Sequence, residues 1–516
     1  MLSNIMVEMP QKGIVKHKTK KVTYVYHILR AYRDEKGHPT NERIAIGKLD
    51  EESGMLIPNK TYYEIYETKT TKEKTEIMKI ETSGITAFFE NAVKSAGLDI
   101  MLKKVFPDKY KKILILAMYM LSEGNVMQHI ENWCEQNKTS DDIVVKSQEI
   151  SKLFESISYD ERMQFFKIMS NARIENEFVA YDVTSVSSYS KNMESAAWGY
   201  NRDKESLPQI NIGMYYGEES KLPLFYTKYP GNINDKSHMK YMLANNDLIN
   251  INKVKFVMDK GFYSKDNIQE LNDKHIRYII SIPNNLKIVT ETIEKYREDI
   301  VLKSNCKLGA NLPYGKSIVT NEFGARLKIC IYYNQNKAND EIEHFFTELD
   351  IHEKKLMNND ELTNSKYNHY FNITEKKGEK KKIVRNEELI DKTLRRLGFF
   401  VLLTTEHVLT EVEILEKYRN KDVVEKSFDN LKNEIDMKRL RCHSDETTDG
   451  KLFVSYIALI IRAYTYERLK EYMKKSNLSY TSVVKELQKV KQVTFSNNYI
   501  DFVPLTKRQR EIFECL

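Results

Sequence analysis

Residues 178–187 read FVAYDVTSVS, residues 209–217 read QINIGMYYG, and residues 222–230 read LPLFYTKYP. All three stretches are rich in β-branched and aromatic residues, and turn-forming residues separate them, which is typical of short strands joined by loops. The rhythm then changes, because a helix is expected over about 236–249 and a strand, KVKFVMD, over 253–259. The sequence therefore predicts three consecutive strands followed by an alternation of helix and strand.

The alternation continues for one more unit. KDNIQELNDK, from residue 265, predicts a helix, and IRYIISIP, residues 276–283, predicts a strand. Three strands followed by alternating helix and strand is the element order of an RNase H-like α/β core. We therefore expect an α/β fold in which residues 176–284 form the first part of such a core.

Segments on either side of this core predict further domains. Residues 285–398 hold strand-like pieces and a basic tract, and predict a β-rich insertion within the core. The strand FFVLLTT leads into a long helix, so residues 399–516 are expected to hold the second part of the core and C-terminal helices. Residues 1–70 predict a β-rich region with a hairpin, and residues 71–175 predict a helical domain.

Composition narrows the class of protein. The chain has 516 residues, of which 41% are hydrophobic and 30% charged, and this suits several globular domains. A formal net charge of +7 permits a nucleic-acid partner without proving one. The five cysteines are scattered and form no CxxC, which argues against a disulfide framework or a zinc site. The sequence has no apolar run of membrane-spanning length and no export signal over residues 1–13, so we expect a cytoplasmic protein.

Two aspartates belong to predicted strands. Asp182 lies inside FVAYDVTS, and Asp259 ends KVKFVMD just before Lys260. A carboxylate among apolar strand residues is unfavourable unless it is paired, hydrogen-bonded or metal-bound. Adjacent parallel strands that end together would bring both within reach of one cation, and Mg²⁺ takes such oxygen ligands. Each aspartate alone is more simply explained as a turn residue or a helix cap.

The predicted helix over 410–435 supplies a third acid. At about 100° per residue, Tyr418, Lys421, Glu425 and Lys432 fall on a stripe about 60° wide. An adjoining apolar stripe can dock on the sheet, which would place Glu425 at the border of core and cleft, within reach of the aspartates. An ordinary amphipathic helix with solvated charge pairs would give the same pattern.

The spacing Tyr418-x2-Lys421-x3-Glu425-x6-Lys432 resembles the Tyr-(2)-Arg-(3)-Glu-(6)-Lys signature of bacterial insertion-sequence transposases, which are DDE enzymes with an RNase H-like core. Lys421 departs from the signature, because Lys keeps the charge of Arg and loses its bidentate fork. Asp182 in YDVTS is similar to the first acidic motif of the family, and Asp259 in VMDKGFYS is similar to the second.

The resemblance covers about residues 178–465 and extends to the branch of the family with a long β-rich insertion before the last acid. The motifs that resemble this branch are Gly199-Tyr200, Arg202-Asp203-Lys204, Pro208-Gln209 and Gly231-Asn232-x-x-Asp235. The N-terminal 150 residues are similar to the family only in general shape.

The resemblance implies a DNA transposase that cuts insertion-sequence ends and joins the freed 3′-hydroxyl to target DNA by two-metal-ion phosphoryl transfer. It implies that Asp182, Asp259 and Glu425 are catalytic and bind Mg²⁺, with Mn²⁺ as a substitute. Tyr418, Lys421 and Lys432 would position the terminal phosphates. Two further cations are expected to bind DNA because they follow Trp198 and Tyr200, whose rings could stack on an unpaired base: Arg202 and Lys204.

The expected partners are the terminal inverted repeats and target DNA in a bacterial chromosome or plasmid, without a membrane. A homodimer is expected in the active complex. Residues 71–175 are the candidate for binding the DNA ends, whereas this segment taken by itself favours an ordinary helical domain.

Two other functions remain open. One is an RNase H-like metal-dependent nuclease that cuts DNA without strand transfer. The other is a catalytically inactive, transposase-derived DNA-binding protein. Retention of all three acids and of the basic helix argues against the second.

Overall fold

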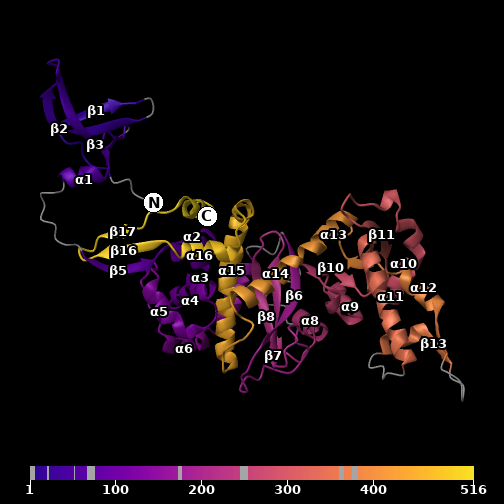
Figure 1. Ribbon diagram of the computed structural model, residues 1–516. Coiled ribbons are helices and arrows are strands. Elements are labelled where there is room, and N and C mark those ends of the chain that lie inside the picture. Colours follow the sequence, from indigo (N-terminus) through magenta and orange to yellow (C-terminus); the bar gives the residue numbers. More distant parts are fainter. Residues whose placement is uncertain are drawn as a thin grey trace. The chain divides into compact units, whose positions relative to one another are not determined.

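The computed structural model describes residues 6–19, 22–51, 53–66, 76–171, 177–244, 254–358, 365–374 and 382–516. The chain forms two compact units. The smaller unit comprises residues 1–84 and 488–506, and the larger comprises residues 85–487 and 507–516. Figure 1 shows the elements of both units, coloured along the sequence.

Within the described residues, the larger unit is built on an eight-stranded sheet with the order β11-β12-β15-β10-β9-β6-β7-β8. Its strands, in chain order, are β6 (Phe178–Ser187), β7 (Gln209–Gly217), β8 (Pro223–Pro230), β9 (Lys255–Met258), β10 (Arg277–Ile282), β11 (Tyr314–Thr320), β12 (Leu327–Tyr333) and β15 (Phe399–Thr404). Strands β6, β7 and β8 are antiparallel neighbours, and β9 runs parallel to both β6 and β10. Strands β15, β12 and β11 extend the sheet in antiparallel pairs.

The predicted core strands are confirmed. Their burial explains why the sequence shows them as apolar runs. Every residue of β7 is buried, and every residue of β6 is buried except the half-buried Asp182. A strand covered on both faces reads as a continuous apolar run. The prediction of a mixed α/β fold is also confirmed.

The helices α8 (Asp235–Ala244) and α9 (Lys265–Asp273) separate the strands β8, β9 and β10, as predicted. Residues 245–249 of the first expected helix lie outside the described residues. The predicted helical stretch before the sheet is present as α2 (Gly84–Ser95), α3 (Leu98–Val105), α4 (Tyr110–Glu123), α5 (Ile130–Gln136), α6 (Ile150–Glu155) and α7 (Tyr159–Asn171).

The segment 285–398, expected to be β-rich, holds helices as well as strands. Besides β11 and β12 it contains α10 (Lys287–Ile300), α11 (Gln335–Met357), β13 (Phe371–Thr374), β14 (Lys382–Arg385) and α12 (Glu387–Leu394). Helix α11 forms because apolar residues recur at helical spacing, with Phe345, Leu349 and Leu356 buried on one face. The expectation of a β-rich segment is therefore corrected to a mixed α/β segment.

The helix expected over 410–435 is interrupted. It consists of α13 (Glu411–Asn420), α14 (Asp422–Asp429) and a π-helical turn, η9 (Asn430–Glu434). A capping box at Thr410 and Glu413 fixes the start of α13, since each side chain bonds the backbone of the other residue.

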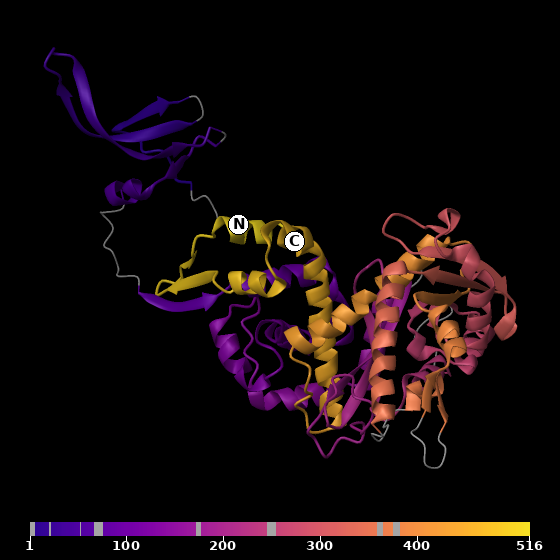
Figure 2. The ribbon, with the colours of Figure 1, turned by 45° about the vertical axis from the view of Figure 1, so that its right-hand side comes forward.

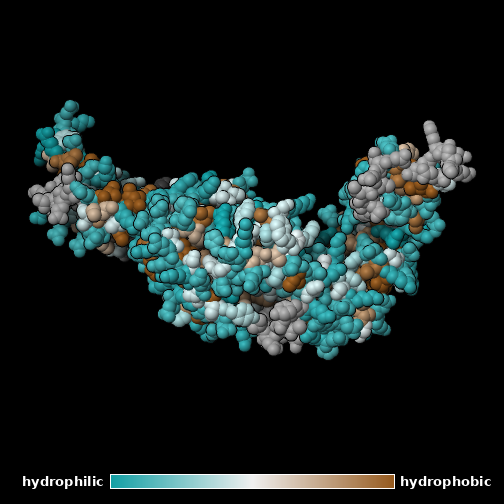
Figure 3. All heavy atoms as spheres, turned by 90° about the horizontal axis from the view of Figure 1, so that it is seen from below, coloured by the Kyte–Doolittle hydropathy of each residue, from teal (hydrophilic) through white to brown (hydrophobic). Residues whose placement is uncertain are grey.

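Helix α15 (Asp445–Ser476) is long and mostly buried, and it packs against α4, α6 and β8 (Figures 1 and 2). It is one of the C-terminal helices expected within residues 399–516. No helix among the described residues has the length and apolar character needed to span a membrane. The surface visible in Figure 3 is mainly hydrophilic, with apolar side chains in small groups. Two short helices follow: α16 (Tyr480–Leu487) and α17 (Lys507–Phe513).

The smaller unit contains two sheets. The first has the antiparallel order β1-β2-β3-β4 and includes the predicted hairpin. Its elements are β1 (Ile14–Lys18), β2 (Thr23–Arg33), β3 (Pro39–Leu49) and β4 (Leu56–Pro58), followed by α1 (Lys60–Tyr66). Val25, Ile46 and Leu56 form its core. The second sheet, not predicted, has the order β17-β16-β5 and consists of β5 (Ile77–Thr82), β16 (Lys491–Phe495) and β17 (Ile500–Phe502).

Candidate active site

The two strand aspartates are neighbours in the central sheet. Strands β6 and β9 pair in parallel with Tyr181 opposite Met258, so the next residues along each strand are Asp182 and Asp259. Neighbouring strands lie about 4.8 Å apart. The juxtaposition expected from the sequence is therefore present, and residues 77 positions apart meet at one level of the sheet.

Both carboxylates lie on the sheet face that α13 covers. Side chains alternate along a strand, so Asp182 shares a face with Phe178, and Asp259 shares a face with Val257. Phe178 and Val257 belong to one hydrophobic cluster with Ile414 and Leu415 of α13, against which Tyr418 also packs. The apolar contacts of this cluster hold α13 against the sheet. The two acids lie on the same face, next to the cluster along the strands.

Asp182 is held in an environment that disfavours its charge. Its Oδ1 accepts a hydrogen bond from the backbone N–H of Val183 at 2.8 Å. Burial nevertheless raises the pKa of Asp182 to about 6, and nearby Lys421 and Arg202 offset part of this effect, whereas Glu425 adds to it. A carboxylate with a raised pKa becomes a strong ligand once a cation compensates for the lost hydration.

Asp259 is held by contacts from its own loop and from α13. Its Oδ1 accepts hydrogen bonds from the backbone N–H of Lys260 at 2.7 Å and from the hydroxyl of Tyr418 at 3.1 Å. Burial and the charge of Asp259 raise the pKa of the Tyr418 hydroxyl, which remains a donor. Tyr418 thus ties the helix to the second acid.

The third acid, Glu425, lies in the first turn of α14. Lys421, at the junction of α13 and α14, donates a hydrogen bond from Nζ to Glu425 Oε1 at 2.9 Å. The Lys421 side chain is 11% exposed and that of Glu425 is 58% exposed. Burial works against the charge of Lys421, but the hydrogen bond to Glu425 and the charges of Asp259, Glu425 and Asp182 raise its pKa overall. One ammonium group therefore interacts with all three acids.

The donor set fits a hard divalent cation, because it consists of carboxylate oxygens from two strands and one helix. Within the described ranges, however, no three Asp, Glu, His or Cys side chains are arranged closely enough to hold a metal ion. Glu425 is instead ion-paired with Lys421 at 2.9 Å. The structure brings the acids into one neighbourhood and does not form a closed triad.

The other predicted DNA-binding residues divide into two groups. Arg202 lies near Asp182, and it is ion-paired with Asp235 at 2.5 Å. Lys432 is buried in the π-helical turn and pairs with Asp203 at 2.7 Å. Lys204 is exposed, with a left-handed backbone (φ 58°). The structure thus brings Tyr418, Lys421, Glu425 and Arg202 to the aspartates, whereas Lys432 contacts Asp203.

The glycine motifs found in the sequence bring two loop segments into close contact near Arg202, one containing Gly199 and the other Gly231. A Cβ on Gly199 would stand 1.9 Å from the carbonyl oxygen of Gly231, so only glycine permits this backbone contact. Gln209 donates from Nε2 to the carbonyl of Tyr200 at 2.8 Å. The Tyr200 side chain remains 81% exposed beside a small cavity of about 160 Å³.

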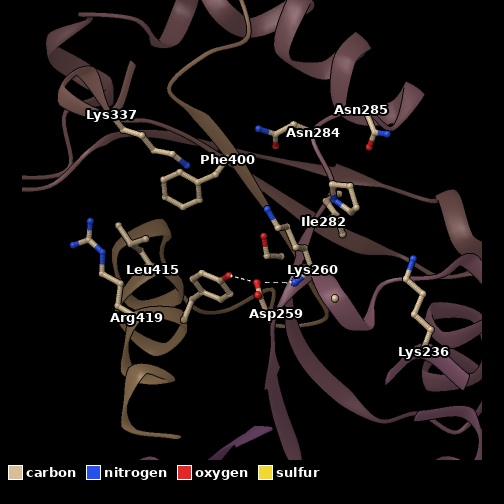
Figure 4. A pocket seen from close by; sticks show the side chains of 14 residues that line it. Lys236, Asp259, Lys260, Ile282, Asn284, Asn285, Lys337, Phe400, Leu415 and Arg419 are labelled. Carbon is tan, nitrogen blue, oxygen red and sulfur yellow. Dashed lines mark hydrogen bonds between the residues drawn. The ribbon is translucent and has the colours of Figure 1, made fainter. Parts of the chain in front are cut away.

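A larger cavity of about 870 Å³ opens beside Asp259. Its lining includes Asp259 and Tyr418 together with the cations Lys236, Lys260, Lys337 and Arg419. Figure 4 shows Arg419 and Lys337 on one side of Asp259 and Lys236 on the other. The cavity therefore carries a positive lining suited to phosphate groups.

Sequence reasoning missed these four cations. Lys260 and Arg419 directly follow Asp259 and Tyr418, so adjacency to the predicted site residues was the signal that could have found them. Lys337 lies in the first turn of α11, within the segment 285–398, and no local pattern indicated that it would reach the site.

Comparisons with known proteins give a family match and similar solved structures. A family model described as a transposase DDE domain matches residues 174–461. Among solved structures, a piggyBac transposase synaptic complex with hairpin DNA is similar at 9% identity, covering 72% of this chain and 78% of that chain, with a TM-score of 0.35. No curated protein matches the chain.

Proposed function

The chain belongs to the transposase DDE domain family, whose model spans more than half of it, and we propose that it cuts insertion-sequence ends and joins the 3′-hydroxyl to target DNA. The observation that carries this proposal is the pairing of β6 with β9, which sets Asp182 beside Asp259 on the face where Glu425 and Lys421 lie. Members of the family depend on a divalent metal. We propose Mg²⁺, which Mn²⁺ can replace.

The strand order supports an RNase H-like core. Strands β8-β7-β6-β9-β10 are contiguous in the sheet, with three antiparallel strands followed by two parallel ones. Under this proposal, residues 176–284 and 399–516 contain the two parts of the core, and residues 285–398 are an insertion that also extends the sheet. Residues 71–175 would bind the DNA ends, and residues 1–70 would form a β-rich region; β5, although within 71–175, belongs to the same compact unit as residues 1–70.

Asp182, Asp259 and Glu425 would hold the metal. When bound, Mg²⁺ would activate water or a 3′-hydroxyl as the nucleophile and stabilise the leaving oxygen. The chain's own part is to orient the ligands: Val183 and Lys260 fix the aspartates through backbone N–H groups, and Tyr418 fixes Asp259. Glu425 would leave its ion pair with Lys421, whose freed ammonium group would then contact a DNA phosphate.

The cations around the cavity would hold the DNA strand next to the acids. Lys236, Lys260, Lys337 and Arg419 line the space beside Asp259, and phosphate contacts of this kind position DNA without reading its sequence. Arg202, Lys204 and Lys432 are proposed to contact DNA on the side of Asp182. Two of them, Arg202 and Lys432, would first have to exchange an intramolecular ion pair for a phosphate.

The proposed partners are the terminal inverted repeats and target DNA in the bacterial cytoplasm, held by a homodimer that brings two ends together. The test is a cleavage and strand-transfer assay with purified protein, Mg²⁺, and DNA that carries the repeats flanking the coding region. Joined products in wild type, and neither cut nor joined products in Glu425→Gln, are expected.

The same assay, combined with a measurement of binding to the same DNA, separates the two alternatives. Cut ends without joined products would favour a nuclease, and DNA binding without cutting would favour an inactive derivative. Either result would overturn the proposed strand transfer.

A further inference from the structure

The first sheet of the smaller unit carries a concentration of positive charge. Its strands β1, β2 and β3 contain six Lys or Arg residues and one acid, Glu42, a net charge of +5, whereas the whole chain has a net charge of +7. Glu42 lies opposite Arg30 in the register of strands β2 and β3. The six cations are Lys16, Lys18, Arg30, Arg33, Arg43 and Lys48.

The two faces of this sheet differ in chemistry. Val25 is buried in the core, so its neighbours Tyr24 and Tyr26 project from the opposite face. Residues paired across strands share a face, which places Lys48 beside Tyr24. His17 joins this face as the partner of Tyr24 on β1. We call this surface the open face; it consists of His17, Tyr24, Tyr26, Arg43 and Lys48.

Aromatic contacts hold the cations of the open face in place. The guanidinium of Arg43 lies over the ring of Tyr26, 4.9 Å from its centroid, and Nζ of Lys48 lies 5.8 Å from the centroid of Tyr24. His17 packs edge-on against Tyr26. Within the described residues, neither Arg43 nor Lys48 forms an ion pair with a carboxylate. The aromatic rings of Tyr26 and Tyr24 therefore hold these two cationic groups in place, and the charges can interact with an anionic partner.

The dimensions of the hairpin fit a DNA duplex. Strands β2 and β3 have 11 residues each. At about 3.3 Å per residue they extend roughly 36 Å, close to one turn of B-DNA. Beyond residue 28, all the remaining residues of β2 are exposed.

We propose that the open face of the β1–β3 sheet binds the phosphate backbone of duplex DNA and adds a second contact surface to the catalytic unit. The proposal rests on the proposed function in that the DNA bound is taken to be the substrate. Arg43 and Lys48 would contact phosphates, and the Tyr24 and Tyr26 hydroxyls would donate to phosphate oxygens.

The test compares two variants of the full chain that lose the same charge. Arg43→Gln/Lys48→Gln changes the open face. Lys16→Gln/Lys18→Gln changes the opposite face, because Lys16 and Lys18 pair with the buried residues Val25 and Thr23. Binding to a fluorescein-labelled random-sequence duplex of about three helical turns is measured by anisotropy over a range of salt concentrations.

We expect the open-face variant to bind about tenfold more weakly, with a slope of log affinity against log salt that is smaller by about 2, and we expect the control to stay within about twofold of wild type. Equal weakening in both variants, or in neither, would overturn the proposal. Binding does not require cutting, so wild-type protein that cleaves no DNA would count against the proposed function and leave this comparison intact.

Discussion

The hydroxyl of Tyr418 donates a hydrogen bond to Oδ1 of Asp259 at 3.1 Å, which joins α13 to the end of β9. The backbone N–H of Lys260 donates to the same oxygen. Both hydrogen bonds therefore go to the same carboxylate oxygen. A tyrosine three residues before Lys421 and seven before Glu425 thus has a definite role: it fixes the helix and the second acid relative to each other.

Replacing Tyr418 with Phe should slow DNA cleavage about tenfold, since loss of one orienting hydrogen bond is worth roughly 1.4 kcal/mol in the transition state. The ring would stay packed in the cluster with Ile414 and Leu415, so folding should be unaffected. The measurement is the single-turnover cleavage rate. Tyr216→Phe is the control, because Tyr216 also loses a buried hydrogen bond, to the carbonyl of Lys221, outside the site. Equal rates for Tyr418→Phe and wild type would refute the role of the hydroxyl.

The burial of Asp182 predicts a pH-dependent stability effect. Its pKa in the folded protein is about 6, above the ordinary value of 3.8, so folding favours the protonated acid. The associated stability is present below pH 4 and is lost as pH rises through about 6. At pH 8 without Mg²⁺, the free energy of unfolding of Asp182→Asn should therefore exceed that of wild type by up to about 3 kcal/mol. Chemical denaturation at pH 4 and pH 8 tests this, and a difference that does not change with pH would contradict it.

Mg²⁺ should stabilise the folded protein through the same carboxylates. A ligand that binds only the folded state at about ten times its dissociation constant adds roughly 1.4 kcal/mol. The melting temperature of wild type should therefore rise with Mg²⁺, and that of Asp182→Asn/Asp259→Asn should stay constant.

The matched control for this experiment is Glu218→Gln. Glu218 is another buried carboxylate, directly after the end of β7, with a pKa raised by burial to about 8, and it lies 4.0 Å from Lys417. We expect this variant to keep the full response to Mg²⁺. A response lost in Glu218→Gln and kept in the double variant would place the metal elsewhere.

The positive cavity predicts that residues 285–398 contribute to DNA binding. Lys337→Gln should weaken binding of substrate DNA several-fold and lower the salt slope by about 1, because Lys337 lines the cavity beside Asp259. Lys354→Gln removes the same charge from an exposed position near the other end of α11 and should leave both quantities unchanged. Indistinguishable affinities for the two variants would remove Lys337 from the DNA path.

Local patterns in the sequence predicted the central sheet because its strands are buried on both faces. The runs at 178–187 and 209–217 match the observed strands residue for residue. The neighbouring positions of Asp182 and Asp259 followed from the same pattern, since parallel strands bring equivalent positions to one level.

Other features depend on contacts that no local pattern contains. The stripe that joined Lys432 to Glu425 assumed an unbroken α-helix, but the π-helical turn at Asn430–Glu434 changes the spacing, and Lys432 meets Asp203. The pairing of β5 with β16 joins segments more than 400 residues apart. The amphipathic pattern of α11 was present in the sequence and was outweighed by the strand-like pieces around it.

The most direct measurement of the central claim is anomalous diffraction from crystals of the protein soaked in Mn²⁺. The proposed mechanism predicts a peak between the carboxylates of Asp182 and Asp259, within coordination distance of an oxygen of each, and its loss in Asp182→Asn. A Mn²⁺ ion bound only at other residues, in a protein that cuts and joins DNA, would contradict it.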